Sequence, residues 1–138
     1  MASRVACFLS LTLLLGVLPG LQGSGPIQIS SKESAAQLGQ KVELACEVRI
    51  STSQGCSWIF QDGSSAPPKL KFIAYVSSLG QSKGIDKQDV KHFSAKKTGD
   101  KYILTVSEFS KKHEGYYFCS SISNSVMYFS RLLPVFLS

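Results

Sequence analysis

The stretch GYYFC, from Gly115 to Cys119, decides the fold of this chain. Its aromatic composition is that of a β-strand, which is entered through a glycine and followed by a run of small residues. Side chains alternate between the two faces of a strand, so Tyr117 and Cys119 share one face while Tyr116 and Phe118 share the other. The stretch comes late in a chain with many short alternating runs, which predicts an all-β fold.

Two earlier residues complete a recognisable set with this strand. Cys46 precedes Cys119 by 73 positions, and Trp58 follows Cys46 closely. A Cys, a Trp soon after it, and a late Cys with a Tyr two residues before it are typical of an immunoglobulin-type β-sandwich. In that fold Cys46 and Cys119 form the disulfide between the two sheets, and the alternative is a disulfide in some other β-protein.

Alternating runs predict the remaining strands. Residues 41–50, 56–61, 69–76 and 101–107 read as strands B, C, C′ and E, Phe93 and Ala95 mark strand D, and 126–137 reads as the last strand. We expect two antiparallel sheets, A-B-E-D and C″-C′-C-F-G, because the extra C′–C″ hairpin makes the sandwich variable-type. The expected core centres on five residues: Trp58, Tyr117, Leu104, Val106 and Phe109.

The N-terminus reads as a processing signal. Arg4 precedes an apolar run, Val5 to Val17, and Pro19, Gly20 and Gly23 follow it. This run is too short to span a bilayer. We therefore expect a signal peptide at residues 1–23, a single variable-type domain at residues 24–138, and passage through the oxidising secretory pathway.

The remaining cysteine and the histidines give little support to catalysis. Cys56 has the same parity as Trp58, which predicts a buried, unreactive free thiol rather than a nucleophile. His92 and His113 stand where many variable domains carry an Arg–Asp salt bridge, so two weakly basic rings are expected close together. A pH switch is the functional alternative for this pair. We find no metal-ligand spacing and no phosphate-binding loop, and we expect neither enzyme activity nor a cofactor.

The charge of the chain suggests no nucleic-acid partner. The net charge is +6, and removal of Arg4 with the signal lowers it to +5. The lysines are scattered in ones and twos, as at Lys96-Lys97 and Lys111-Lys112, without interleaved exposed aromatic residues. They read as a solvated surface, or alternatively as a surface complementary to an acidic partner.

The outer face of the C, C′, F and G strands reads as unusually apolar, which is typical of an interface. Gln61 lies three places after Trp58, where antibody variable domains carry a Gln that pairs across a two-fold axis. The alternative is that a C-terminal tail packs against this face. The expected dimer-interface residues are Gln61, Phe118, Ile59, Ile73 and Phe129, with Tyr116 and Leu132 at the same face or its edge.

Three segments carry a closer resemblance. GCSWIFQ (55–61), GYYFCSSISNSVMYFS (115–130) and LPVFL (133–137) resemble the alpha chains of the T-cell co-receptor for class I MHC. The resemblance implies a receptor domain that clamps an acidic loop on the membrane-proximal domain of the class I heavy chain. It implies homodimers, or heterodimers with a related beta chain. Homophilic adhesion, or another antigen-receptor-like role, is the alternative function.

Carried over by position, the resemblance implies contacts with class I from three loops. The FG loop supplies Ser123, Asn124, Ser125 and Val126, the BC loop Gln54 and Ser57, and the C′–C″ region Tyr75 and Ser77. Members of this family continue into a stalk, a transmembrane helix and a tail that binds a Src-type kinase. We expect none of these in this chain, which reads as an ectodomain of a plasma-membrane receptor or as a secreted form.

Overall fold

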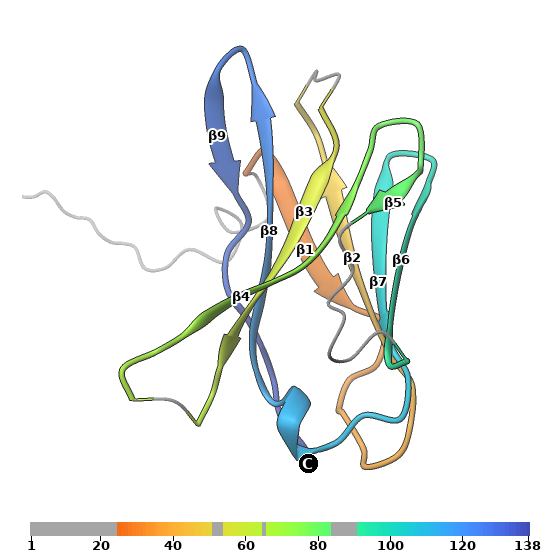
Figure 1. Ribbon diagram of the computed structural model, residues 1–138. Helices are drawn as coiled ribbons and strands as arrows, with labels where there is room; N and C mark the ends of the chain where they lie inside the picture. Colours follow the sequence, from red (N-terminus) through yellow and green to blue (C-terminus); the bar gives the residue numbers. More distant parts are fainter. Residues whose placement is uncertain (1–24, 51–53, 65, 84–90) are drawn as a thin grey trace, which may run out of the picture.

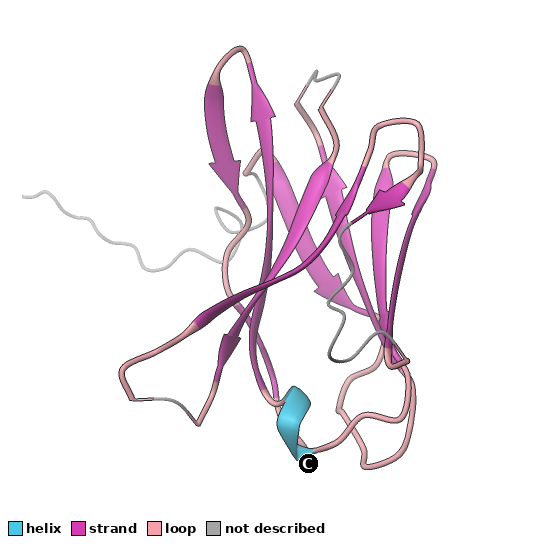
Figure 2. Cartoon of the chain, viewed as in Figure 1, coloured by secondary structure: helices cyan, strands magenta, loops and turns pink. Residues whose placement is uncertain are grey.

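The computed structural model describes residues 25–50, 54–64, 66–83 and 91–138, and the expected signal peptide lies outside them. The described residues form two facing antiparallel sheets and a single short 3-10 turn, η1 (Lys111–His113) (Figures 1 and 2). The first sheet has the order β1 (Ile27–Ser31), β2 (Val42–Val48), β7 (Lys101–Val106) and β6 (Phe93–Thr98). The second has the order β10 (Leu133–Val135), β8 (Gly115–Ser123), β3 (Cys56–Asp62), β4 (Leu70–Val76) and β5 (Ser82–Lys83), with β9 (Val126–Phe129) also paired to β8.

This arrangement confirms the predicted sandwich. In the lettering used above, the first sheet is A-B-E-D, and the second is C″-C′-C-F-G with strand G divided in two. The alternating runs of the sequence fall on these strands because each strand has one face against the facing sheet and one against solvent.

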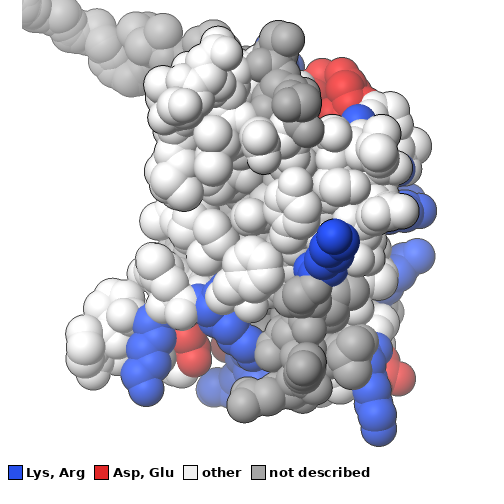
Figure 3. All heavy atoms as spheres, turned by 45° about the horizontal axis from the view of Figure 1, so that its top comes forward, with Lys and Arg blue, Asp and Glu red and all other residues white. Residues whose placement is uncertain are grey.

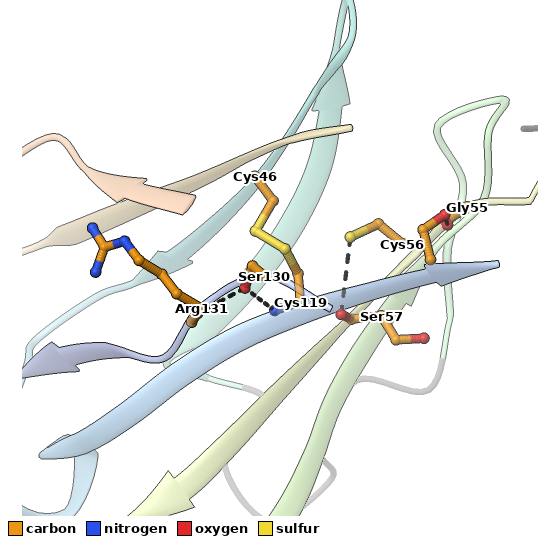
Figure 4. Close-up of a disulfide and its surroundings, with 8 residues drawn as sticks. Cys46, Gly55, Cys56, Ser57, Cys119, Ser130 and Arg131 are labelled. Atoms are coloured by element: carbon orange, nitrogen blue, oxygen red, sulfur yellow. Dashed lines mark hydrogen bonds between the residues drawn. A yellow bond between two sulfur atoms is a disulfide. The ribbon is translucent and has the colours of Figure 1, made fainter. Parts of the chain in front are cut away.

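The core lies between the sheets and is closed by the Cys46–Cys119 disulfide, whose Cα atoms are 6.7 Å apart (Figure 4). All five predicted core residues are fully buried. The Tyr117 hydroxyl donates a hydrogen bond of 2.6 Å to the carbonyl oxygen of His113, which ties strand β8 to the η1 turn. Such a bond, from the Tyr two residues before the second Cys to a backbone carbonyl a few residues upstream, is the tyrosine corner of immunoglobulin-type sandwiches.

One predicted position is wrong, and the reason is a bulge in β4. Trp58 pairs with Ala74 but Ile59 pairs with Phe72, so Ile73 is an extra residue in β4. Ile73 was expected on the outer face and is instead fully buried in the core beside Ala74. Phe72 takes the outward position opposite Ile59, and its side chain is 49% exposed.

The last strand is also divided, where one continuous strand was expected. β9 ends at Phe129. Ser130 lies outside the strand, but its backbone and its hydroxyl each form a hydrogen bond with Cys119 (Figure 4). The Ser130 N–H donates to the Cys119 carbonyl oxygen at 2.9 Å, and the Cys119 N–H donates to Ser130 Oγ at 3.0 Å. The chain then resumes pairing with the start of β8 through β10.

Candidate functional site

Three connections of the sandwich meet at one end, opposite the C-terminus (Figure 1). We call this the distal end, and define it by the start of β3, the β4–β5 turn and the β8–β9 hairpin. The predicted FG-loop, BC-loop and C′–C″ residues all belong to these connections or to the strand ends beside them. Residues 51–53 of the BC connection lie outside the described residues.

The β8–β9 hairpin has a two-residue turn. Ser123 pairs with Val126, and between them Asn124 and Ser125 have φ values of 52° and 64°. Positive φ at both central residues is the pattern of a type I′ turn, which glycine and asparagine adopt with the least strain. Asn124, Ser125 and Val126 are exposed, whereas Ser123 is buried, so the structure leaves three of the four predicted FG-loop residues accessible.

Gly55 fixes the base of the BC connection to two neighbouring strands. Its N–H donates to the Tyr75 hydroxyl on β4 at 3.1 Å, and its carbonyl accepts a buried 2.7 Å hydrogen bond from Ser121 Oγ on β8. A Cβ at this position would lie 1.8 Å from the Val76 carbonyl oxygen, so only glycine fits this close approach.

The residues beside this anchor differ in accessibility. Gln54 is exposed at the end of the connection, and Ser57 is half-buried on the outer face of β3, paired with both Tyr75 and Ser120. The Tyr75 side chain is half-buried, and its hydroxyl is already in contact with Gly55. Tyr75 therefore shapes the BC connection whether or not it also touches a partner.

The β4–β5 turn runs from Ser77 to Gln81 and is closed by backbone hydrogen bonds. The Ser77 N–H donates to the Gln81 carbonyl oxygen at 2.8 Å, and the Gly80 N–H donates to the Ser77 carbonyl oxygen at 2.9 Å. Ser77 Oγ accepts the Gln81 N–H at 3.0 Å, so this predicted contact residue also stabilises its own turn. Leu79, at the tip, is 90% exposed.

The hairpin region carries no charge. Residues 120–130 contain no Asp, Glu, Lys or Arg. With the distal end turned forward, uncharged side chains cover the upper left of the surface, and Lys and Arg lie to the right, in the lower part and near the middle (Figure 3). Contacts at the hairpin must therefore come from hydrogen bonds and apolar packing, while the lysines lie to the sides.

A second surface lies on the outer face of the second sheet, away from the core. Ile59 faces Phe118 and Phe72 across its two neighbouring strands, and the rings of Phe118 and Phe129 are 6.2 Å apart. Gln61 is half-buried between Leu70 and Tyr116. We call this the apolar outer face, and its members are Ile59, Gln61, Leu70, Phe72, Tyr116, Phe118 and Phe129.

Several of these apolar side chains are accessible in the single chain. Leu70 is 66% exposed, Phe72 49% and Phe129 51%, whereas Phe118 is only 9% exposed. A contiguous patch of this kind usually marks an interface. Sequence parity predicted Ile59, Gln61, Phe118 and Phe129 at this face. It missed Leu70 and Phe72, because the bulge in β4 has no sequence signal.

Cys56 is the one free cysteine among the described residues, and it is buried. Burial raises the pKa of the Cys56 thiol from 9.0 to about 12, although a hydrogen bond with the Ser120 backbone acts in the opposite direction. The thiolate, which is the nucleophilic form, is therefore scarce at neutral pH. Within the described parts of the chain, no group of three His, Cys, Asp or Glu side chains could hold a metal ion.

The two histidines are close together, as predicted. Their ring centroids are 5.4 Å apart, and His113 is buried against the rings of Phe93 and Phe109. His113 Nδ1 accepts the Ser110 N–H at 3.0 Å, which places the ring proton of the neutral form on Nε2. His92 Nε2 lies 3.4 Å from Glu108 Oε1. This cluster fastens the η1 turn to the base of the core, at the end opposite the hairpin.

Comparison with known proteins identifies the family. The model of the immunoglobulin V-set domain matches residues 29–137. The chain belongs to the immunoglobulin V-set family. In antibody variable domains, the B–C, C′–C″ and F–G loops at one end form the antigen-binding site. The distal end carries the corresponding loops of this chain.

Two relatives and one solved structure refine this assignment. The chain is 58% identical to the T-cell surface glycoprotein CD8 alpha chain of Rattus norvegicus, over 99% of this chain and 58% of the relative. It is 49% identical to the CD8 alpha chain of Mus musculus, over 98% of this chain and 59% of the relative. The crystal structure of the swine CD8aa homodimer matches this V-set domain with a TM-score of 0.71 and 37% identity, over 83% of this chain and 99% of that one.

These matches confirm the resemblance found in the sequence. The chain spans a little under three fifths of the length of the rat and mouse relatives, 58% and 59%. In the part of this V-set chain that the structure describes, no helix is long and apolar enough to cross a membrane.

Proposed function

We propose that this chain is the recognition domain of a T-cell co-receptor and binds the class I MHC heavy chain through its distal end. The similarity to CD8 alpha chains of rat and mouse supports the co-receptor role. The partner surface is an exposed acidic loop on the membrane-proximal domain of the heavy chain. Bound there, the receptor assists antigen recognition by cytotoxic T cells.

The conformation of the β8–β9 hairpin carries the proposal for the binding site. Its tip exposes two polar side chains on a turn that glycine would adopt with less strain. Strained, exposed residues on a rigid hairpin are common at binding sites. Asn124 can both donate to and accept from backbone groups that binding removes from water. Ser125 and Val126 extend this surface. The remaining proposed contacts with class I surround it: Gln54, Ser57, Tyr75, Ser77 and Ser123.

We propose that two copies bind together through the apolar outer face. The swine structure that matches this chain is a homodimer. A two-fold axis near Gln61 and Phe118 would place two hairpins side by side, so that they grip one protruding loop from both sides. Pairing with a related beta chain through the same face is the heteromeric form of this proposal.

The proposal extends to the segments outside the described residues. Residues 1–23 are assigned as a signal peptide and residues 24–138 as the mature domain. The domain is displayed on the external face of the plasma membrane in the full-length receptor, or secreted as a shorter form. A Src-type kinase would bind only the cytoplasmic tail of that full-length receptor.

A binding titration on immobilised class I tests the proposed site. Wild-type chain is compared with Asn124→Gly, which removes the amide while keeping a residue suited to positive φ. Unpaired backbone groups left at the interface cost roughly 1–3 kcal/mol, so binding should weaken by about fivefold or more. Class I with neutral residues in its acidic loop should bind as poorly.

The control is Gln37→Ala, which removes an exposed side-chain amide from the β1–β2 connection, next to Ala36, whose carbonyl oxygen accepts the N–H of the C-terminal Ser138. It should bind like the wild type. Wild-type affinity of the Asn124→Gly variant would move the site away from the hairpin. If class I never binds but cells bearing the chain adhere to each other, homophilic adhesion through the apolar outer face replaces this proposal.

A further inference from the structure

Lys97 occupies an inward position at the distal end of β6. Phe93, Ala95 and Lys97 alternate with the exposed residues of this strand, and Lys97 pairs with the buried Tyr102 of β7. Its Nζ lies 5.6 Å from the centre of the Tyr102 ring. A long side chain in such a place can cover apolar surface with its methylene groups while its amine reaches a polar partner. The sequence pattern had placed this residue among the solvated lysines.

The amine of Lys97 reaches the other sheet. Nζ donates a hydrogen bond of 2.7 Å to the Ser78 carbonyl oxygen in the β4–β5 turn. β6 and β4 belong to different sheets, so no backbone ladder joins them here. The Lys97 side chain lines a hollow of about 100 Å³ between the sheets, together with Val48, Ile50, Ser78, Asp100 and Tyr102. The hydrogen bond therefore joins β6 to the β4–β5 turn across this hollow.

The turn that receives this hydrogen bond has little apolar anchoring of its own. Leu79 is almost fully exposed, Gly80 has a φ of 93°, and Gln81 is exposed. Among the described residues, the turn is held by its internal hydrogen bonds and by the bond from Lys97. A hydrogen bond from a charged donor is stronger than a neutral one, especially where the donor is half-buried. Loss of the hydrogen bond from Lys97 to Ser78 would leave the turn free to move as a unit.

We propose that Lys97 is a positioning residue, which holds the β4–β5 turn in the conformation that binds the partner. The inference rests on the proposed function of the distal end, because the turn includes Ser77 and lies beside Tyr75. Lys97 itself need not touch the partner. Its effect is preorganisation: a turn that is already ordered loses less conformational entropy when the complex forms.

The test uses a matched set of three variants. Lys97→Met keeps an unbranched apolar side chain over Tyr102 and removes the donor, whereas Lys97→Arg keeps both charge and donors. Lys96→Met removes the same charge from the neighbouring residue, which points to solvent. Melting temperatures verify that all three variants are folded.

Two measurements are made on each variant. Backbone ¹⁵N relaxation of Leu79, Gly80 and Gln81 in the chain alone reports the order of the turn. A titration on immobilised class I reports affinity. We expect Lys97→Met to lower the order parameters of the turn and to weaken binding about three- to tenfold. Lys97→Arg and Lys96→Met should resemble the wild type in both measurements.

The outcomes separate this inference from the function on which it rests. Unchanged relaxation in Lys97→Met overturns the positioning role, as does a disordered turn with wild-type affinity. Equal weakening by Lys96→Met overturns it as well, since net charge would then account for the effect. If wild-type chain does not bind class I at all, the proposed function fails, and Lys97 loses its role in recognition even where the relaxation data show that it orders the turn.

Discussion

At the tip of the β8–β9 hairpin, two consecutive residues have left-handed backbone and neither is glycine. Asparagine tolerates this conformation because its side chain can bond to nearby backbone, but serine does so less readily. The hairpin would close more easily with glycine after Asn124. Serine at this position therefore lowers the stability of the hairpin relative to glycine. Such a cost is expected where the side chain takes part in binding.

This strain gives a first prediction at the residue scale. Ser125→Gly should raise the stability of the domain by about 0.5–1 kcal/mol, and Asn124→Ala should lower it by about 1 kcal/mol, because alanine is strained at positive φ. Thermal unfolding of both variants beside the wild type checks this. Asn124→Gly serves as the control and should melt close to the wild type. An equal melting temperature for all four chains would contradict the strain at the tip.

A second prediction concerns Cys56. The native fold keeps the thiol proton up to a pKa of about 12, while the unfolded chain loses it near the ordinary value of 9.0. The unfolded state therefore binds fewer protons above pH 9, so stability is full below that pH and falls as the pH rises toward 12. Between pH 8 and pH 10 this group alone should lower the free energy of unfolding by about 1.4 kcal/mol.

The measurement compares wild type with Cys56→Ala, using folding and unfolding rates in urea at both pH values. Tyr102 is present in both chains, and its pKa is raised mainly by burial; the smaller contribution that Cys56 makes to raising it is lost in the alanine variant. The alanine variant should lose less stability between pH 8 and pH 10 than the wild type, by about the amount given above. In the native wild type, thiol reagents should label Cys56 only slowly at pH 8. Equal pH dependence of the two chains, or rapid native labelling, would falsify the burial of the thiol.

At the scale of the elements, the bulge in β4 decides which side chains lie on the apolar outer face. Without it, strict alternation would place Ile73 outward and Phe72 inward. The extra residue reverses the parity of the first half of β4 and leaves that of the second half unchanged. This allows two consecutive residues, Ile73 and Ala74, to be buried together.

The third prediction follows from this reversal. Phe72→Asp places a charge twice at the proposed two-fold interface and should give a folded monomer, because this side chain is half exposed in the single chain. Ile73→Asp should instead prevent stable folding, since an unpaired charge in the core costs several kcal/mol. Sedimentation together with thermal unfolding distinguishes these two results.

Phe118→Asp is a less selective test of the same face. Phe118 is only 9% exposed and packs near Phe129, so its replacement should lower stability as well as weaken the dimer. If Phe72→Asp sediments as wild-type dimers, the interface lies elsewhere on the domain. If Ile73→Asp folds normally, the assigned register of β4 is wrong.

At the scale of the whole molecule, the disulfide joins β2 of one sheet to β8 of the other across a separation of 73 residues. In the chain-entropy model, a loop of this size should contribute about 4 kcal/mol. Replacing both Cys46 and Cys119 with alanine should therefore remove much of the stability of a small domain. Urea unfolding measures the difference, and Cys56→Ala is the control that leaves the disulfide intact. A double variant as stable as that control would contradict the prediction.

The sequence predicted the architecture well, for a physical reason. Cys46, Trp58 and Tyr117 are buried at positions that alternation within single strands determines, and their order along the chain matches one topology. The sequence did not reveal the bulge at Ile73, the interruption at Ser130 or the reach of Lys97 to Ser78. Each of these depends on how one strand meets another element, and such contacts leave no periodic signal along the chain.

The same limit applies to the candidate site. The small polar run after GYYFC predicted an exposed hairpin, and Asn124, Ser125 and Val126 are indeed exposed. Burial of Ser123 and the ties from Ser121 and Tyr75 to Gly55 required the three-dimensional arrangement. Side chains within the sheets that hold the loops in place were therefore harder to predict than the side chains that the loops expose to solvent.

The opposite placement of the hairpin and the C-terminus has a mechanical consequence (Figure 1). If a partner holds the hairpin while a tether pulls at Ser138, the force runs along β9 and β10, and their hydrogen bonds with β8 are loaded together in shear. The pulled end is fastened at two points: the Leu137 N–H binds Glu114 Oε2 at 2.8 Å, and the Ser138 N–H binds the Ala36 carbonyl oxygen at 3.0 Å. Tension applied in this direction would thus be shared among several bonds at once, which favours a domain that stays folded while its contact with the partner breaks.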